Sequence, residues 1–301
     1  MNSIPKVFHK IWFGPKEETL RYSDKWLDKF PDYELKIWNN DNLGPYFTKM
    51  VEYLGELPKC SYNFVSDTLR LLITYDEGGI YLDHDVEIIK NFEHLLSGSK
   101  TYLTFQYPIC DNPPELLPNT TMRDIITQGG DNGKSNKKLY KNELVYDELI
   151  NKDDYINACF IATVPKSPII KTALELYLKN YHSVHKYPMS DWGYGPQVLS
   201  HAAEQYGIIL NGRTQQNEYV KVFQQDYLHP LHGADRLRNK EEFEIKLKRA
   251  YENAFTIHHH VFSNMKAYAE SLYKTQDKFL LEAHAFTNWY LNEYKRDKHE
   301  L

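Results

Sequence analysis

Cysteine is scarce in this sequence. The 301 residues contain three cysteines, Cys60, Cys110 and Cys159, which lie far apart and form no Cys-x-x-Cys pair. This odd, scattered set is unlike a disulfide framework or a cysteine-based zinc site. We therefore expect a protein of a reducing compartment, without a zinc site built on cysteine.

Long apolar runs and an excess of positive charge are also missing. No run approaches the roughly 18 apolar residues that span a bilayer, and the start of the chain lacks the apolar core of a signal peptide. The net charge is −5, from 36 basic and 41 acidic residues, which argues against nucleic acid as a partner. We expect a cytoplasmic protein, with a peripheral contact to the inner face of the membrane left open.

Tyrosine, in contrast, is abundant. The chain has 24 tyrosines, and hydrophobic residues make up 42% of it, which is enough for a folded core. A tyrosine ring combines a flat apolar face with a hydrogen-bonding hydroxyl. The excess therefore fits either a tyrosine-rich core or a cleft for sugars and bases.

Short apolar runs alternate along the chain with segments of helical periodicity. This alternation predicts an α/β fold built on a layered sheet. The expected strands are 6–12, 33–38, 80–82 and 155–164, and the expected helices are 19–29, 62–75, 167–181 and 197–206.

Two segments differ from this pattern. Residues 110–154 are rich in proline, glycine and lysine, which predicts a long flap on the acceptor side of a site. Residues 265–301 predict a C-terminal helical extension with aromatic and basic side chains. That extension either packs on the core or contacts a membrane surface.

The strongest chemical signal is Asp83-His84-Asp85, at the end of the expected strand that begins at Ile80. Residues two apart in extended chain face the same way, so the two carboxylates should converge. Paired carboxylates suit Mg²⁺ or Mn²⁺, which keeps open positions for phosphate oxygens.

A second signal lies upstream, where Ser66-Asp67 is followed three residues later by Arg70. Asp67 and Arg70 form either an exposed helical ion pair or, beside the aspartates, a set of contacts to the hydroxyls and phosphates of a sugar donor.

Together these blocks resemble a known family. SDTLRLLITYDEGGIYLDHDVE, with IPKVFHKIWFG, PDYELKIWNND, INACFIA and YGPQ, is similar to the DxD-containing glycosyltransferase family 32 of Och1-like mannosyltransferases and bacterial capsular polysaccharide enzymes. The resemblance implies a GT-A-like fold, a mixed sheet flanked by helices, over residues 1–264. It also implies a UDP- or GDP-linked sugar donor and a divalent cation, Mn²⁺ or Mg²⁺.

The resemblance also assigns roles to residues. Asp85, with Asp83, would hold the cation, and His259 is the expected third ligand from the histidine run 258–260. Asn264 stands where the family usually has a tryptophan. Donor contacts are expected from Trp12, Phe13, Gly14, Trp38, Ser66, Tyr81, Asn157, Gln197 and Ser263, although plain core packing stays open for the tryptophans and a structural role for the amides.

We therefore expect a metal-dependent enzyme that moves a hexosyl unit from a nucleotide sugar to a saccharide or lipid-linked saccharide acceptor. The resemblance implies retention of configuration and a place in capsule or surface-polysaccharide synthesis. Three alternatives stay open: a host-modifying glucosyltransferase effector, a metal-dependent phosphohydrolase and a non-catalytic carbohydrate-binding protein.

Overall fold

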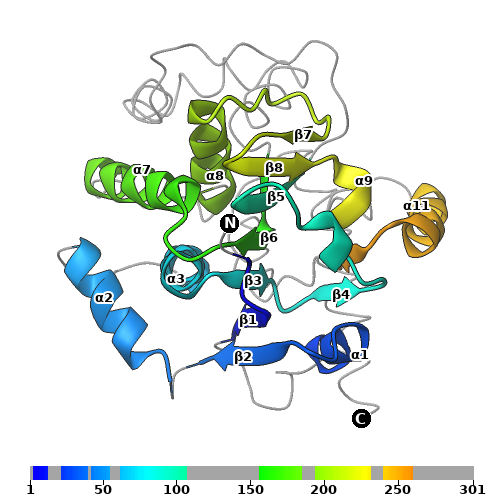
Figure 1. The fold of residues 1–301 in the computed structure, drawn as a ribbon, viewed down its shortest axis with the longest axis horizontal. Helices are drawn as coiled ribbons and strands as arrows, with labels where there is room; N and C mark the ends of the chain where they lie inside the picture. The colour runs from blue at the N-terminus through cyan, green and yellow to red at the C-terminus, as the bar shows by residue number, and fades with distance from the viewer. Residues whose placement is uncertain are drawn as a thin grey trace, which may run out of the picture.

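A seven-stranded mixed sheet forms the centre of the molecule (Figure 1). The computed structural model describes residues 3–12, 22–39, 42–54, 62–106, 156–184, 194–231 and 240–259. The strands lie in the order β2-β1-β3-β6-β5-β8-β7. They are β1 (Val7–Ile11), β2 (Glu34–Trp38), β3 (Gly79–Leu82), β5 (Thr101–Phe105), β6 (Ile156–Thr163), β7 (Gln215–Gln216) and β8 (Val220–Phe223).

The direction of the strands changes in the middle of this sheet. β1 runs parallel to both β2 and β3, whereas β6 runs antiparallel to β3 and to β5. The carboxyl ends of β1 and β3 therefore share one edge with the amino-terminal half of β6. A second sheet has two strands, β4 (Val86–Ile88) and β9 (Thr256–His258), which pair antiparallel.

Helices cover both faces of the large sheet. Figure 1 shows α2 (Gly44–Leu54), α3 (Tyr62–Glu77), α7 (Pro168–Val184) and α8 (Tyr194–Gln205) along one side. The other side carries α1 (Trp26–Lys29), α9 (Gln225–Leu228) and α11 (Lys240–Asn253). Apolar side chains of the sheet pack against each layer, so two main core clusters form, one per face.

Gly79 opens β3 in a conformation that other residues rarely adopt, with φ +89°. A Cβ at this position would lie 2.6 Å from Val7 Cγ1 in the neighbouring strand β1. Glycine is therefore required where the chain leaves α3 and enters the sheet. This close approach brings β3 and the residues that follow it against β1.

The expected α/β class, with a mixed sheet flanked by helices, is confirmed. The four expected strands and the helices 62–75 and 167–181 are present with small shifts at their ends. The helix expected at 197–206 starts earlier, at Tyr194, because Gly195 and Pro196 are accommodated in its first turn.

Other details differ from the sequence prediction. The helix expected at 19–29 is, in its described part, a 3₁₀ turn (Ser23–Lys25) followed by the short α1. Helix α2 and strands β4, β5 and β8 were not predicted. The flap 110–154 and the extension 265–301 fall outside the described residues, so the division into domains stays a prediction. In the described part of the chain, no helix has the length and apolar character to cross a membrane.

Candidate metal and donor site

Asp83 and Asp85 lie in a tight turn between β3 and β4, not in extended chain as expected. The Val86 N–H donates to the Asp83 carbonyl (3.1 Å), and the Asp83 N–H donates to the carbonyl of Cys159 in β6 (3.0 Å). One oxygen of each carboxylate and one nitrogen of His258 all lie within 4.8 Å of one another. The carboxylates therefore converge through a turn and not through strand alternation.

Arg70 of α3 holds the Asp83 side of the turn. Its guanidinium lies 2.9 Å from Asp67 and 3.3 Å from Asp83, and it donates to the carbonyl of Ala158 at 2.8 Å. Burial opposes the charge of Arg70, but the neighbouring carboxylates outweigh it and raise its pKa. The guanidinium stacks over the ring of Tyr81, whose hydroxyl donates to Asp83 at 2.8 Å.

Asp67 faces the first turn of α8. The Gly195 N–H donates to its carboxylate at 3.2 Å, and a Cβ on Gly195 would lie 3.0 Å from the Asp67 carboxyl carbon. A helix N-terminus favours a carboxylate at this place. Burial nevertheless raises the pKa of Asp67, with Arg70 acting in the opposite direction. Glycine at position 195 lets the carboxylate approach the helix.

His258, the last residue of β9, holds the other side of the turn. Its Nε2–H donates to Asp85 Oδ1 at 3.0 Å, and Asp83 Oδ2 lies 3.9 Å away. Burial alone would lower the pKa of His258, but the Asp85 carboxylate outweighs it and raises the pKa well above its ordinary value. Asp85 is only 4% exposed, so the positive charge of the His258 ring offsets a large part of the cost of burying the Asp85 carboxylate.

A buried lysine lies on the same side as Asp85. Lys10 of β1 is fully buried and donates to the Ser23 hydroxyl at 2.8 Å. Burial lowers the pKa of Lys10 to about 8, while the charges of Asp85 and Asp24 act to raise it. Positively charged side chains of three elements thus lie near the aspartate turn: Arg70 of α3, Lys10 of β1 and His258 of β9.

The donor set fits a divalent cation. Asp83 and Asp85 offer two carboxylate oxygens, and His258 offers one imidazole nitrogen once a cation displaces the Nε2 proton. Carboxylates suit both Mg²⁺ and Mn²⁺, and the imidazole favours Mn²⁺. Three protein ligands leave further coordination positions for a ligand that carries phosphate oxygens.

The family comparison supports this interpretation of the turn. Residues 16–102, which include Asp67, Arg70 and the aspartate turn, match the family described as "Glycosyltransferase sugar-binding region containing DXD motif". This segment of the chain is therefore similar to the sugar-binding region of DXD glycosyltransferases. The family resemblance seen in the sequence is thereby confirmed.

Two curated relatives match over part of their length. The chain is 31% identical over 103 residues to "Inositol phosphoceramide mannosyltransferase 3" of Schizosaccharomyces pombe, covering 31% of this chain and 28% of that protein. It is 31% identical over 164 residues to "Subversion of eukaryotic traffic protein A" of Legionella pneumophila, covering 42% of this chain and 25% of the relative. The matches thus span about a quarter of these relatives.

Solved structures of glycosyltransferases are similar at low identity. "PaToxG Glycosyltransferase" matches with a TM-score of 0.39 and 20% identity, over 83% of this chain and 79% of the other. The glycosyltransferase GlyE of Streptococcus pneumoniae matches with a TM-score of 0.43 and 12% identity, over 95% of this chain and 64% of the other.

The structure brings His258, and not His259, to the DXD turn. Neighbouring residues of a strand face opposite ways, so His259 points away and its Nε2–H donates to Glu87 at 2.9 Å. Its ring stacks on Tyr22 at a centroid distance of 4.5 Å. The choice of His259 as third ligand is therefore not supported by the geometry, and His258 takes its place as candidate.

The two tryptophans end neighbouring strands at the edge of the site. Trp12 packs against His84 of the DXD turn, with ring centroids 4.7 Å apart. Trp38 stacks on His9 and donates its indole N–H to that ring at 3.1 Å. Both rings are half-buried, and Trp12 lies nearer the aspartates.

The polar residues that were expected to contact the donor lie in different surroundings. Asn157 is buried, and its amide donates to Gln106 (2.8 Å) and His229 (3.0 Å) and accepts from the Cys159 N–H (2.6 Å). These contacts favour its structural role. Ser66 hydrogen-bonds the Tyr81 hydroxyl beside the DXD turn, whereas Gln197 is half-buried in the first turn of α8. Phe13, Gly14, Ser263 and Asn264 lie outside the described residues.

Sequence reasoning missed Lys10, Gly195 and Glu87. A lysine inside an apolar strand was an available signal for Lys10, because lysine is almost never buried without a specific partner. Gly195 lies in the block YGPQ, but the sequence gives no sign of its contact with Asp67. Nothing in the sequence pairs Glu87 with the histidine run, since the two strands are far apart along the chain.

Proposed function

We propose that the chain is a metal-dependent hexosyltransferase that moves a sugar from a UDP- or GDP-linked donor to a saccharide acceptor. The observation that carries the proposal is that His258 converges on Asp83 and Asp85 of the family region, beside the Asp67–Arg70 pair. A phosphohydrolase with two metals would need more acidic or histidine ligands.

The chain's own residues have distinct parts in this reaction. A cation held by Asp83, Asp85 and His258 would neutralise the charge that develops on a leaving diphosphate. Arg70 makes its contacts inside the protein and so fixes Asp83 relative to α3. Asp67 lies beside the N-terminus of α8, where a sugar hydroxyl could donate to it.

Finer features of the proposal depend on resemblance. We propose retention of configuration, a lipid-linked or free saccharide acceptor, and a place in surface-polysaccharide synthesis at the cytoplasmic face of the membrane. The resemblance of the sequence blocks to capsular enzymes supports these features. A relative named as an inositol phosphoceramide mannosyltransferase is consistent with a hexosyl donor and a lipid-linked acceptor.

A second candidate is the modification of a host protein. It is favoured by the similarity to a Legionella protein whose name refers to the subversion of eukaryotic traffic. The same cation and donor site would serve both reactions, so the acceptor alone separates them.

A donor screen tests the proposal. The purified chain is incubated with UDP- and GDP-hexoses and Mn²⁺ or Mg²⁺, and nucleotide release is measured. Asp85→Ala should lower the rate by at least about 10²-fold, the effect of losing one electrostatic element of the transition state. Asp28→Ala, at an exposed position of α1, is the matched control and should leave the rate unchanged.

The outcomes separate the candidates. Near-normal nucleotide release by a folded Asp85→Ala protein contradicts the proposed site. Transfer of labelled sugar to saccharide or lipid-linked saccharide fractions supports the first candidate, and transfer to protein fractions supports the second. No release from any donor with either cation contradicts both.

A further inference from the structure

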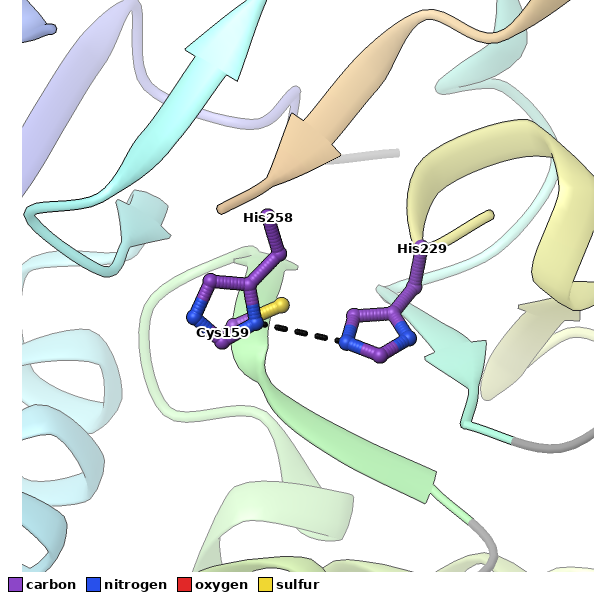
Figure 2. A group of neighbouring side chains, drawn as sticks. All are labelled: Cys159, His229 and His258. Carbon is purple, nitrogen blue, oxygen red and sulfur yellow. Dashed lines mark hydrogen bonds between the residues drawn. The ribbon is translucent and has the colours of Figure 1, made fainter. Parts of the chain in front are cut away.

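A second cluster of metal-ligating side chains lies next to the DXD turn. Cys159 comes from the middle of β6, His229 from the residue after α9, and His258 from the end of β9 (Figure 2). One ligand atom of each lies within 4.8 Å of the other two. Figure 2 shows the thiol and the two rings directed toward one another.

We propose that Cys159, His229 and His258 form a second metal site, for Zn²⁺ or a similarly thiophilic divalent cation. The donor set differs from that of the DXD turn in its chemistry. A thiolate with two imidazoles selects borderline and soft ions such as Zn²⁺, whereas the paired carboxylates favour Mn²⁺ and Mg²⁺.

The distance between the two rings fits a tetrahedral ion. His229 Nε2 and His258 Nδ1 are 3.3 Å apart. With Zn–N bonds of about 2.0–2.1 Å, two nitrogen ligands of a tetrahedral site are separated by about 3.3–3.4 Å. The two histidines therefore already have the spacing of zinc ligands.

The outer ring nitrogen of His258 is also arranged as in zinc sites. A ligating histidine commonly donates its other N–H to a carboxylate, which fixes the orientation of the ring. His258 does this through Nε2, which donates to Asp85 at 3.0 Å while Nδ1 faces His229. His258 would thus serve one site at a time, because its Nε2 cannot both donate to Asp85 and bind the cation of the DXD turn.

The side chains of this cluster are buried, unlike a chance grouping of ligand-type residues on the surface. Cys159 is 1% exposed and His229 is fully buried. Asn157 donates to the same His229 nitrogen at 3.0 Å, so its amide must give up this contact when the ion enters. One neutral hydrogen bond is a small loss against the bonds that a thiolate and two imidazoles make to zinc.

Cobalt spectroscopy on the full chain tests the proposal. After chelation and dialysis the protein is titrated with Co²⁺, which gives a thiolate-to-cobalt charge-transfer band only if sulfur is a ligand. The band should appear in the wild type and in a Cys60→Ser/Cys110→Ser double variant, which retains Cys159 as its single cysteine. It should disappear in Cys159→Ser, and Zn²⁺ affinity should fall by at least about 100-fold there.

Asp83→Asn is the control for the neighbouring site, because it alters the DXD turn and leaves all three proposed ligands in place. It should keep the charge-transfer band. Circular dichroism checks the fold of each variant, and the double variant decides the matter even if Cys159→Ser does not fold. Cobalt spectra without a sulfur band in the wild type, or loss of the band in the double variant, would overturn the proposal. Neither measurement depends on sugar transfer.

Discussion

Acid pH should weaken the sheet that carries the site, through one buried histidine. His9 of β1 is fully buried. Its Nε2–H donates to the Gly78 carbonyl at 2.9 Å, and its Nδ1 accepts the indole N–H of Trp38 at 3.1 Å. The neutral ring therefore satisfies both nitrogens, whereas a proton on Nδ1 would face the Trp38 donor.

The size of the effect follows from the pKa of this ring. Burial lowers the pKa of His9 from 6.5 to about 4. Between these values the unfolded chain binds a proton that the folded chain does not, so the free energy of unfolding falls as the pH falls. The full loss is about 3 kcal/mol below pH 4, of which about 2 kcal/mol has been lost by pH 4.5.

Urea denaturation at several pH values measures this loss. The free energy of unfolding is compared between wild type and His9→Gln from about pH 7 to about pH 4.5. The wild type should lose about 2 kcal/mol more than the variant over this range. His94→Gln, in the 3₁₀ turn Glu93–Leu95, is the control and should follow the wild type. Parallel pH profiles for wild type and His9→Gln would refute the reasoning.

Three further predictions concern the DXD turn. Gly195→Ala places a Cβ about 3.0 Å from the Asp67 carboxyl and should raise the KM for the sugar donor several-fold, with kcat less affected. Arg70→Lys leaves a buried carboxylate without its planar partner, so it should lower the free energy of unfolding by about 3 kcal/mol in urea denaturation. His258→Ala should raise the Mn²⁺ concentration for half-maximal nucleotide release more than His259→Ala does, and equal effects would contradict the assignment.

Local sequence patterns predicted the parts of the site that form within one stretch of chain. The apolar periodicity of residues 62–75 identified α3, and the three-residue spacing put Asp67 and Arg70 on one face of it. The paired aspartates after a short apolar run identified the DXD turn. Each of these features depends on neighbours a few residues away, so the sequence displays them directly.

The register between β4 and β9 determines which histidine of the run reaches Asp85, and the sequence alone does not reveal this register. His258 and Asp85 are 173 positions apart, and they meet because β9 pairs with β4 so that His258 lies opposite Val86. A shift of that register by one residue would send His259 to Asp85 in its place. Because three histidines follow one another, a histidine would face Asp85 in either register. Only the pairing of the two strands makes that histidine His258.

The two carboxylates of the DXD turn are held from opposite sides by independent elements. Asp83 is fixed by Arg70, which belongs to α3 and is tied to the carbonyl of Ala158 in β6. Asp85 is fixed by His258, which belongs to the small β4–β9 sheet. The charges that compensate the two carboxylates therefore come from different layers of the fold and hold the turn from both sides. The reversal of strand direction at β6 makes this possible, since it places the Cys159 carbonyl where the Asp83 N–H can donate to it and anchors the turn at its centre.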